Sequence, residues 1–254
     1  RFGRYRGHRA LTRRAGSHQV SLLFSLIRGA VNNPVMKLDP TGRLDGDFYD
    51  EFDNLIGSDG IDDGKVYVIN TSETEFENGN DVIKGKGQSL EVSNEAMNFV
   101  SNNNGDSQAF ENNSNVCDCF TELPGSSELR NDAMDYADLN CDLETATISV
   151  SPVNDPSYQH TNQDVGKETS SGAEVKVLGM QLVNDPGYII NLDFHSHNAV
   201  KSNGVRLSQP PSQNDINNAL ENGNSVVYGL GSKQVYLHNN EGVNAVVHPN
   251  TFRR

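Results

Sequence analysis

The sequence predicts an α/β fold with a mixed sheet over residues 126–254. Three observations support this fold class. Apolar residues recur at helical spacing over Ser127–Leu139, as in an amphipathic helix that packs on a sheet. The runs Leu143–Val150 and Tyr188–Phe194 are rich in β-branched or other apolar residues, which are typical of strands. Two further strand-like runs flank a Gly-Ser-Lys turn within residues 226–238 and predict a hairpin.

Residues 43–125 differ in composition and predict a loop-rich acidic connector. Runs of acidic residues and glycine occupy Asp45–Asp53 and Ser58–Gly64, and Asn-rich stretches follow. Within this segment we expect one strand, Lys65–Ile69, and one helix, Val92–Val100. Oxygen-rich runs can bind calcium, but neither run has the spacing of a calcium-binding loop. Solvated turns are therefore expected, and a calcium-binding surface fragment is kept as an alternative.

Charge is unevenly distributed along the 254 residues, whose net charge is −14. Residues 1–31 hold seven arginines and no acid, so the remainder has 13 basic residues against 34 acidic ones, a net of −21. Such an acidic body would repel phosphates, which argues against nucleic acid as a ligand. The apolar run Val20–Ile27 is shorter than the ~20 residues that a membrane helix needs, so no membrane span is expected.

The start of the chain has three interpretations. The Arg-rich residues 1–31 could form a nucleic-acid-binding arm, an irregular lead-in, or the product of a shifted reading frame. The last hypothesis is motivated by the abrupt change of composition at Asn32, and a sensible upstream sequence in the present frame would reject it. Because the chain lacks an initiator Met, we expect it to be part of a longer protein.

The most informative motif is His195-Ser-His197, followed by Ser212-Gln-Asn-Asp215. Alternate side chains of a strand point the same way, so both imidazoles should face one side of the sheet. Ser212 follows Pro210-Pro211 and precedes a helical pattern, so it is also expected to cap that helix and to fix the direction of Asp215. Two imidazoles and one carboxylate predict a Zn²⁺ site with one open position, as in catalytic zinc centres.

This ordered motif resembles the signature of JAB/JAMM (MPN+) metalloproteases, in which a glutamate precedes His-Ser-His and Ser-x-x-Asp. The resemblance implies a JAB/MPN-like mixed sheet flanked by helices. It also implies that His195, His197 and Asp215 bind zinc and that Ser212 stabilises the tetrahedral intermediate. The upstream glutamate would handle the proton of the attacking water. The implied reaction is hydrolysis of a peptide or isopeptide bond.

Two features depart from the family pattern. Asn198 stands where a proline usually follows the second histidine, and the loop 198–211 is longer than usual. These departures keep a second hypothesis open, a catalytically inactive JAB-like module that only binds a partner.

Three residues are candidates for the upstream glutamate. Glu144 opens a strand-like run after a helix, 51 residues before His195, which suits the family order and makes it our first choice. Glu168 and Glu174 are alternatives, and Glu174 begins a strand-like run of its own. Each of these glutamates could instead be an ordinary solvent-facing carboxylate at the end of a strand, without a catalytic role.

The segment Asn32–Gly42 is a short apolar stretch that ends in a Pro-Thr-Gly turn. Its Asn-Asn-Pro and Asp-Pro-x-Gly elements resemble the end of the RHS-repeat-associated core, after which a variable C-terminal toxin begins. With the zinc motif, the resemblance implies that residues 1–42 end such a core and that 126–254 form a JAB-like metallopeptidase toxin domain. It further implies a larger bacterial protein, secreted or delivered from the cell surface, that acts in a target cell. A protein, peptide or ubiquitin-like substrate and a cognate immunity protein are the implied partners.

The remaining cysteines and histidines predict little chemistry. Three cysteines, Cys117, Cys119 and Cys141, form no paired framework and no second metal pair, so free thiols are expected. His238 and His248 lie on or after an expected strand, and we interpret them as core or surface residues rather than ligands.

Overall fold

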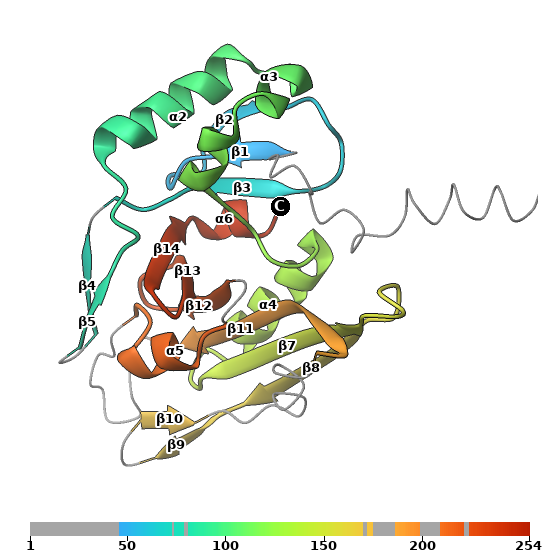
Figure 1. Cartoon of the computed structure of the whole chain (residues 1–254). Helices are drawn as coiled ribbons and strands as arrows, with labels where there is room; N and C mark the ends of the chain where they lie inside the picture. Colours follow the sequence, from blue (N-terminus) through green and yellow to red (C-terminus); the bar gives the residue numbers. More distant parts are fainter. Residues whose placement is uncertain are drawn as a thin grey trace, which may run out of the picture. The chain divides into compact units, whose positions relative to one another are not determined.

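The residues that the computed structural model describes all lie within Asp39–Arg254 (Figure 1). The expected RHS-like segment Asn32–Gly42 and the Arg-rich residues 1–31 lie outside this description. The described residues are 46–72, 74–78, 81–169, 172–174, 186–198, 209–220 and 224–254.

A six-stranded mixed sheet forms the centre of the described part, in the order β14-β13-β12-β11-β7-β8. Strands β11 and β12 pair in parallel, and every other neighbouring pair is antiparallel. The mixed α/β class and the hairpin of β12 and β13 are therefore confirmed. The strands are β7 (Thr145–Pro152), β8 (His160–Val165), β11 (Tyr188–His197), β12 (Ser225–Gly229), β13 (Gln234–Asn239) and β14 (Gly242–Val247).

Helix α4 (Ser127–Leu139) covers one face of this sheet and has the predicted bounds. Ser126 caps it by accepting a hydrogen bond from the Leu129 N–H group. The apolar face of α4 packs against Phe194 and Val226 in the largest hydrophobic cluster. The short helix α5 (Gln213–Asn218) and the hairpin of β4 (Glu75–Asn78) and β5 (Asp81–Lys84) cover the other face. Ile216 and Ile83 supply the contacts there.

The expected loop-rich connector over 43–125 is wrong for its described part, which folds into a second sheet. The strand expected at Lys65–Ile69 and the helix expected at Val92–Val100 are confirmed, as Val66–Ile69 and within Leu90–Asn102. Its order is β2-β1-β3-β6, and three helical segments pack beside it. The ring of Phe48 stacks on Tyr67 at 5.3 Å and on Phe110 at 5.2 Å, so aromatic side chains among the acidic runs build a core. The elements are β1 (Asp47–Tyr49), β2 (Leu55–Ser58), β3 (Val66–Ile69), β6 (Phe120–Glu122), α2 (Leu90–Asn102), α3 (Ser107–Glu111) and η1 (Ser114–Cys119).

The two sheets share hydrophobic contacts across the expected boundary at residue 126. Tyr49 and Val68 of the small sheet belong to the same buried cluster as Phe194 and Val226 of the large one. A small hairpin of β9 (Lys167–Thr169) and β10 (Gly172–Glu174) and the C-terminal helix α6 (Pro249–Phe252) complete the elements. Among the described helices, none combines the length and the apolar composition that a membrane span requires.

A buried arginine ties α6 to α4. Arg130 is 1% exposed, and its Nε atom donates to the Phe252 carbonyl at 2.6 Å. Its Nη1 atom donates to the carbonyl groups of Pro124 and Gly125. Burial lowers the pKa of Arg130 to about 10, which still leaves the guanidinium charged at neutral pH. Three carbonyl groups before α4 and at the chain end therefore depend on one side chain.

We predict that Arg130→Met lowers the free energy of unfolding by on the order of 3 kcal/mol, because buried carbonyl groups lose their donors. Urea denaturation of the two proteins measures this loss. Arg253→Met is the matched control, because Arg253 is more exposed and pairs with the exposed Asp135. Its loss should stay below about 1 kcal/mol. Equal losses in the two variants would contradict the anchoring role of Arg130.

Candidate metal centre

The two histidines of the motif project from the end of the central strand β11. His195 lies opposite Ala146 of β7 and Val227 of β12, so its backbone is held on both sides. Ser196 points to the opposite face, where its hydroxyl accepts a hydrogen bond from the Thr145 N–H group at 2.9 Å. Both imidazoles therefore face the same side of the sheet, as alternation predicts.

The carboxylate of Asp215 is oriented by the start of helix α5. Ser212 caps this helix, and its hydroxyl accepts from the Asp215 N–H group at 3.2 Å. In return, Asp215 Oδ2 accepts from the Ser212 N–H group at 2.6 Å and from its hydroxyl at 2.7 Å. This reciprocal capping box confirms the expected cap and fixes the direction of the carboxylate.

These three side chains meet at one point above the sheet. His195 Nε2 lies 3.4 Å from Asp215 Oδ1, and His197 Nε2 lies 3.4 Å from Asp215 Oδ2. One ligand atom from each residue lies within 4.8 Å of the other two. The side chains are largely buried, with exposed fractions of 24%, 10% and 17% in chain order.

The geometry fits a divalent cation. Ligand atoms about 2.0–2.1 Å from a tetrahedral zinc ion lie about 3.3 Å apart, close to the 3.4 Å that separates each imidazole from the carboxylate. The Nε2 atom of His195 is buried and makes no well-formed hydrogen bond to any described residue, so no other group competes with a cation for its direction. His195, His197 and Asp215 could therefore hold a metal ion. Two imidazoles and a carboxylate suit zinc among several divalent metals.

Without a cation, the centre is held by an ion pair. Burial alone would lower the pKa of His195, but the adjacent Asp215 carboxylate outweighs it and raises that pKa to about 9. Burial would raise the pKa of Asp215, yet the two imidazoles hold it well below its usual range. At neutral pH a binding cation must therefore displace a proton from His195.

Glu144 lies beside this centre. It immediately precedes β7, and continuing the antiparallel register by two residues from the Ala146–His195 pair places it opposite His197. Burial lowers the pKa of His195, and the charges of Asp215, Asp193 and Glu144 raise it, with the contribution of Glu144 the smallest of the three. Glu168 and Glu174 lie on β9 and β10, but their side chains are outside the described part of the structure.

The long loop after His197 starts and ends at anchored residues. The Asn198 side chain donates to the Asp142 carbonyl at 2.9 Å, and the Gln209 side chain donates to the Asn198 carbonyl at 2.9 Å. The Gln209 side-chain oxygen in turn accepts from the Gly231 N–H group. The amide of Asn198 thus holds the end of β11 by a bond that a proline could not make. Residues 199–208 are not described.

Sequence reasoning missed a polar row next to the ligands. The Ser225 hydroxyl donates to Asp193 Oδ2 at 2.6 Å, and Asp193 lies two residues before His195 on the same face. His238 lies opposite Ser225 and is 1% exposed. The period of two along β11 could have identified Asp193, but His238 depends on the register of a distant strand. His238 is a core residue, as expected, whereas His248 is partly exposed and caps α6.

The free thiols are uninvolved as far as the structure describes them. Cys119 is buried at the end of η1, and Cys141 is exposed. The Cys117 side chain lies outside the described set.

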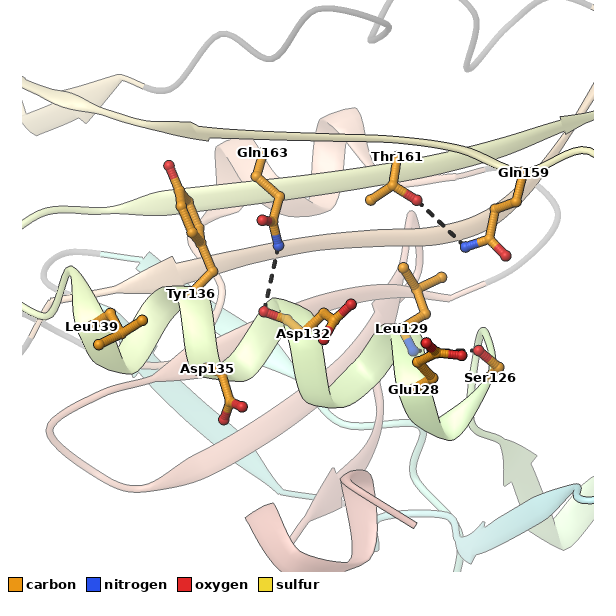
Figure 2. Close-up of a pocket in the computed structure, with 10 residues that line it drawn as sticks. All are labelled: Ser126, Glu128, Leu129, Asp132, Asp135, Tyr136, Leu139, Gln159, Thr161 and Gln163. Atoms are coloured by element: carbon orange, nitrogen blue, oxygen red, sulfur yellow. Dashed lines mark hydrogen bonds between the residues drawn. The ribbon is translucent and has the colours of Figure 1, made fainter.

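A groove of about 650 Å³ lies between α4 and β8, away from the metal centre (Figure 2). Gln163 of β8 reaches across it to the Asp132 carbonyl and also donates to the hydroxyl of Thr147, its partner on β7. Thr147 is adjacent to Ala146, the partner of His195, so its side chain points to the opposite face of the sheet. The groove therefore does not belong to the His195 site.

No protein family, curated protein sequence or solved structure was found to match this chain.

We predict that zinc binding strengthens by about tenfold per pH unit from pH 6.5 to 8.5, because the cation competes with one proton on His195. Calorimetric titration in buffers of different ionisation enthalpy measures both the affinity and the proton released. The raised pKa also means that His195 stabilises the metal-free protein below pH 6.5 and that this contribution is lost as the pH rises through about 9. An affinity that does not change over this range would contradict the ion pair.

Proposed function

We propose that the chain is a zinc-dependent peptidase or isopeptidase that acts as the C-terminal toxin module of an RHS-type polymorphic protein. The observation that carries this proposal is the convergence of His195, His197 and Asp215 on one point, with Glu144 beside them. Three protein ligands leave one coordination position for water or substrate, as in catalytic rather than structural zinc centres.

Each residue has a defined task in such a reaction. A bound zinc ion would polarise the scissile carbonyl and lower the pKa of a water molecule to about 7. Glu144 would accept the proton of the attacking water and return it to the leaving amine. Ser212 would donate to the developing oxyanion after exchanging its present hydrogen bond to Asp215.

The biological setting in this proposal rests on sequence resemblance alone. The segment Asn32–Gly42 supports an RHS-type shell upstream, and the motif order supports JAB-like chemistry. In that setting the protein would be secreted or delivered from the cell surface and would act in a target cell. Its substrate would be a protein, a peptide or a ubiquitin-like conjugate, and the producing cell would need an immunity protein.

A second candidate function is binding without catalysis. It is favoured by Asn198, by the long loop, and by Ser212, whose hydroxyl group already donates its hydrogen bond to Asp215.

The calcium alternative has less support in the described residues. The Asp59 side chain accepts a hydrogen bond from the Ile61 N–H group, and the Asp63 side chain accepts one from the Lys65 N–H group. This pattern, to the backbone two residues later, is typical of aspartates in turns.

We expect purified wild-type protein to carry one zinc ion per chain, and His197→Ala and Asp215→Ala to carry none. Loss of one of three protein ligands weakens the site strongly because few donors remain. Elemental analysis after dialysis against a weak chelator measures the metal content. His160→Ala, which changes an exposed histidine on β8, should retain the zinc. A wild-type protein without stoichiometric metal would end this proposal.

We expect Glu144→Gln to keep the zinc and to lower kcat by about 10²–10⁴-fold, because it removes the proton acceptor. Cleavage of a peptide library and of ubiquitin-like conjugates provides the assay. Glu128→Gln on α4 is the control and should be fully active. If zinc-loaded wild-type protein cleaves nothing in either assay, the binding-only function is favoured instead.

A further inference from the structure

The polar row beside the metal centre contains a histidine that the proposed reaction does not use. His238 lies on β13, is 1% exposed, and neither ring nitrogen has a hydrogen-bond partner among the residues that the structure describes. Ile216, Val227 and Tyr236 form an apolar cluster on the same side of the sheet. A buried polar ring without partners destabilises a fold, and an apolar ring of similar size would avoid that cost. The stability of the fold therefore does not explain why position 238 is a histidine.

The register of the sheet places His238 on the face that carries the metal ligands. His238 pairs with Ser225 of β12, and the Phe194–Val226 pair places Asp193 next to Ser225 on β11. Asp193, Ser225 and His238 thus follow one another across three adjacent strands. Directly opposite residues of antiparallel strands have Cβ atoms about 4.5–5.5 Å apart, so the ring of His238 lies within reach of the Ser225 hydroxyl.

The Ser225 hydroxyl joins the elements that carry the ligands. It donates to Asp193 Oδ2 at 2.6 Å, and so contacts the strand that bears both histidines. It also accepts from the Leu220 N–H group at 3.2 Å, and so contacts the end of the segment whose helix bears Asp215. A hydroxyl oxygen has two lone pairs, of which Leu220 uses one. The other can accept a hydrogen bond from an imidazole N–H group.

We propose that His238 is a positioning residue of the metal centre: with a cation bound, its ring donates to Ser225 and thereby holds Asp193 and the end of the α5 segment in place. This inference rests on the proposed metal centre. His238 itself is not a member of the ligand group, which comprises His195, His197 and Asp215. Burial and the neighbouring His195 lower the pKa of His238 to about 3, so the ring adds no positive charge beside the cation. Outer residues that orient ligands in this way typically change metal affinity by 10–100-fold.

The experiment measures the zinc Kd at one pH, by competition with a chromophoric chelator, together with the Tm of the metal-free protein. His238→Phe should bind zinc about 10-fold more weakly or worse, while its Tm is unchanged or higher. His238→Gln keeps an N–H donor and should bind within about threefold of the wild type. His160→Phe, the same substitution at an exposed histidine on β8, should leave both quantities unchanged.

Ser225→Ala tests whether His238 acts on the metal centre through the Ser225 hydroxyl. It also takes the place of His238→Phe if that variant does not fold. It should weaken zinc binding by about 10-fold or more, and adding His238→Phe should weaken it by no more than about twofold further, because both changes remove the same contact. Zinc affinity equal to the wild type in His238→Phe or Ser225→Ala would refute the inference while leaving the metal centre intact. A wild-type protein that binds no zinc would refute the proposed function as well.

Discussion

The parallel pairing of β11 with β12 determines where the metal centre lies. Two parallel strands cannot be joined by a tight turn, so the chain must cross over the sheet between them. Helix α5 lies on that crossover, which brings its first turn back to the carboxyl end of β11, where the two histidines are. The Leu230 N–H group donates to the His197 carbonyl at 3.0 Å and closes the same end of the pair. Asp215 meets the imidazoles because of this topology.

The contacts that orient the ligands of the centre also hinder the binding of a cation. Asp215 is fixed by Ser212 and paired with His195, so its carboxylate is oriented before any cation arrives. That pairing also places a proton on His195, which a cation must displace at neutral pH. Pre-orientation therefore favours binding through geometry and opposes it through proton competition. His238 adds a buried polar ring that the apolar cluster around it does not need.

Local patterns predicted the elements whose signals lie within one segment. Ser127–Leu139 has helical periodicity and a serine cap, and β11 alternates up to its histidines, so both were predictable. Of the small sheet only β3 was predicted, because its strands have only three or four residues. Its core also depends on Phe48 and Phe120, which lie far apart in the chain and meet at 5.0 Å. The ligand set followed from spacing and resemblance, whereas His238 required the register of β13 against β12.

The most direct test of this account is a crystal structure of the zinc-soaked protein, with anomalous scattering measured at the zinc absorption edge. We predict one strong peak per chain, about 2.0–2.1 Å from Nε2 of His195, from Nε2 of His197 and from a carboxylate oxygen of Asp215, with one further position facing solvent. An absent peak, or a peak held by other side chains while these three keep their ion pair, would contradict it.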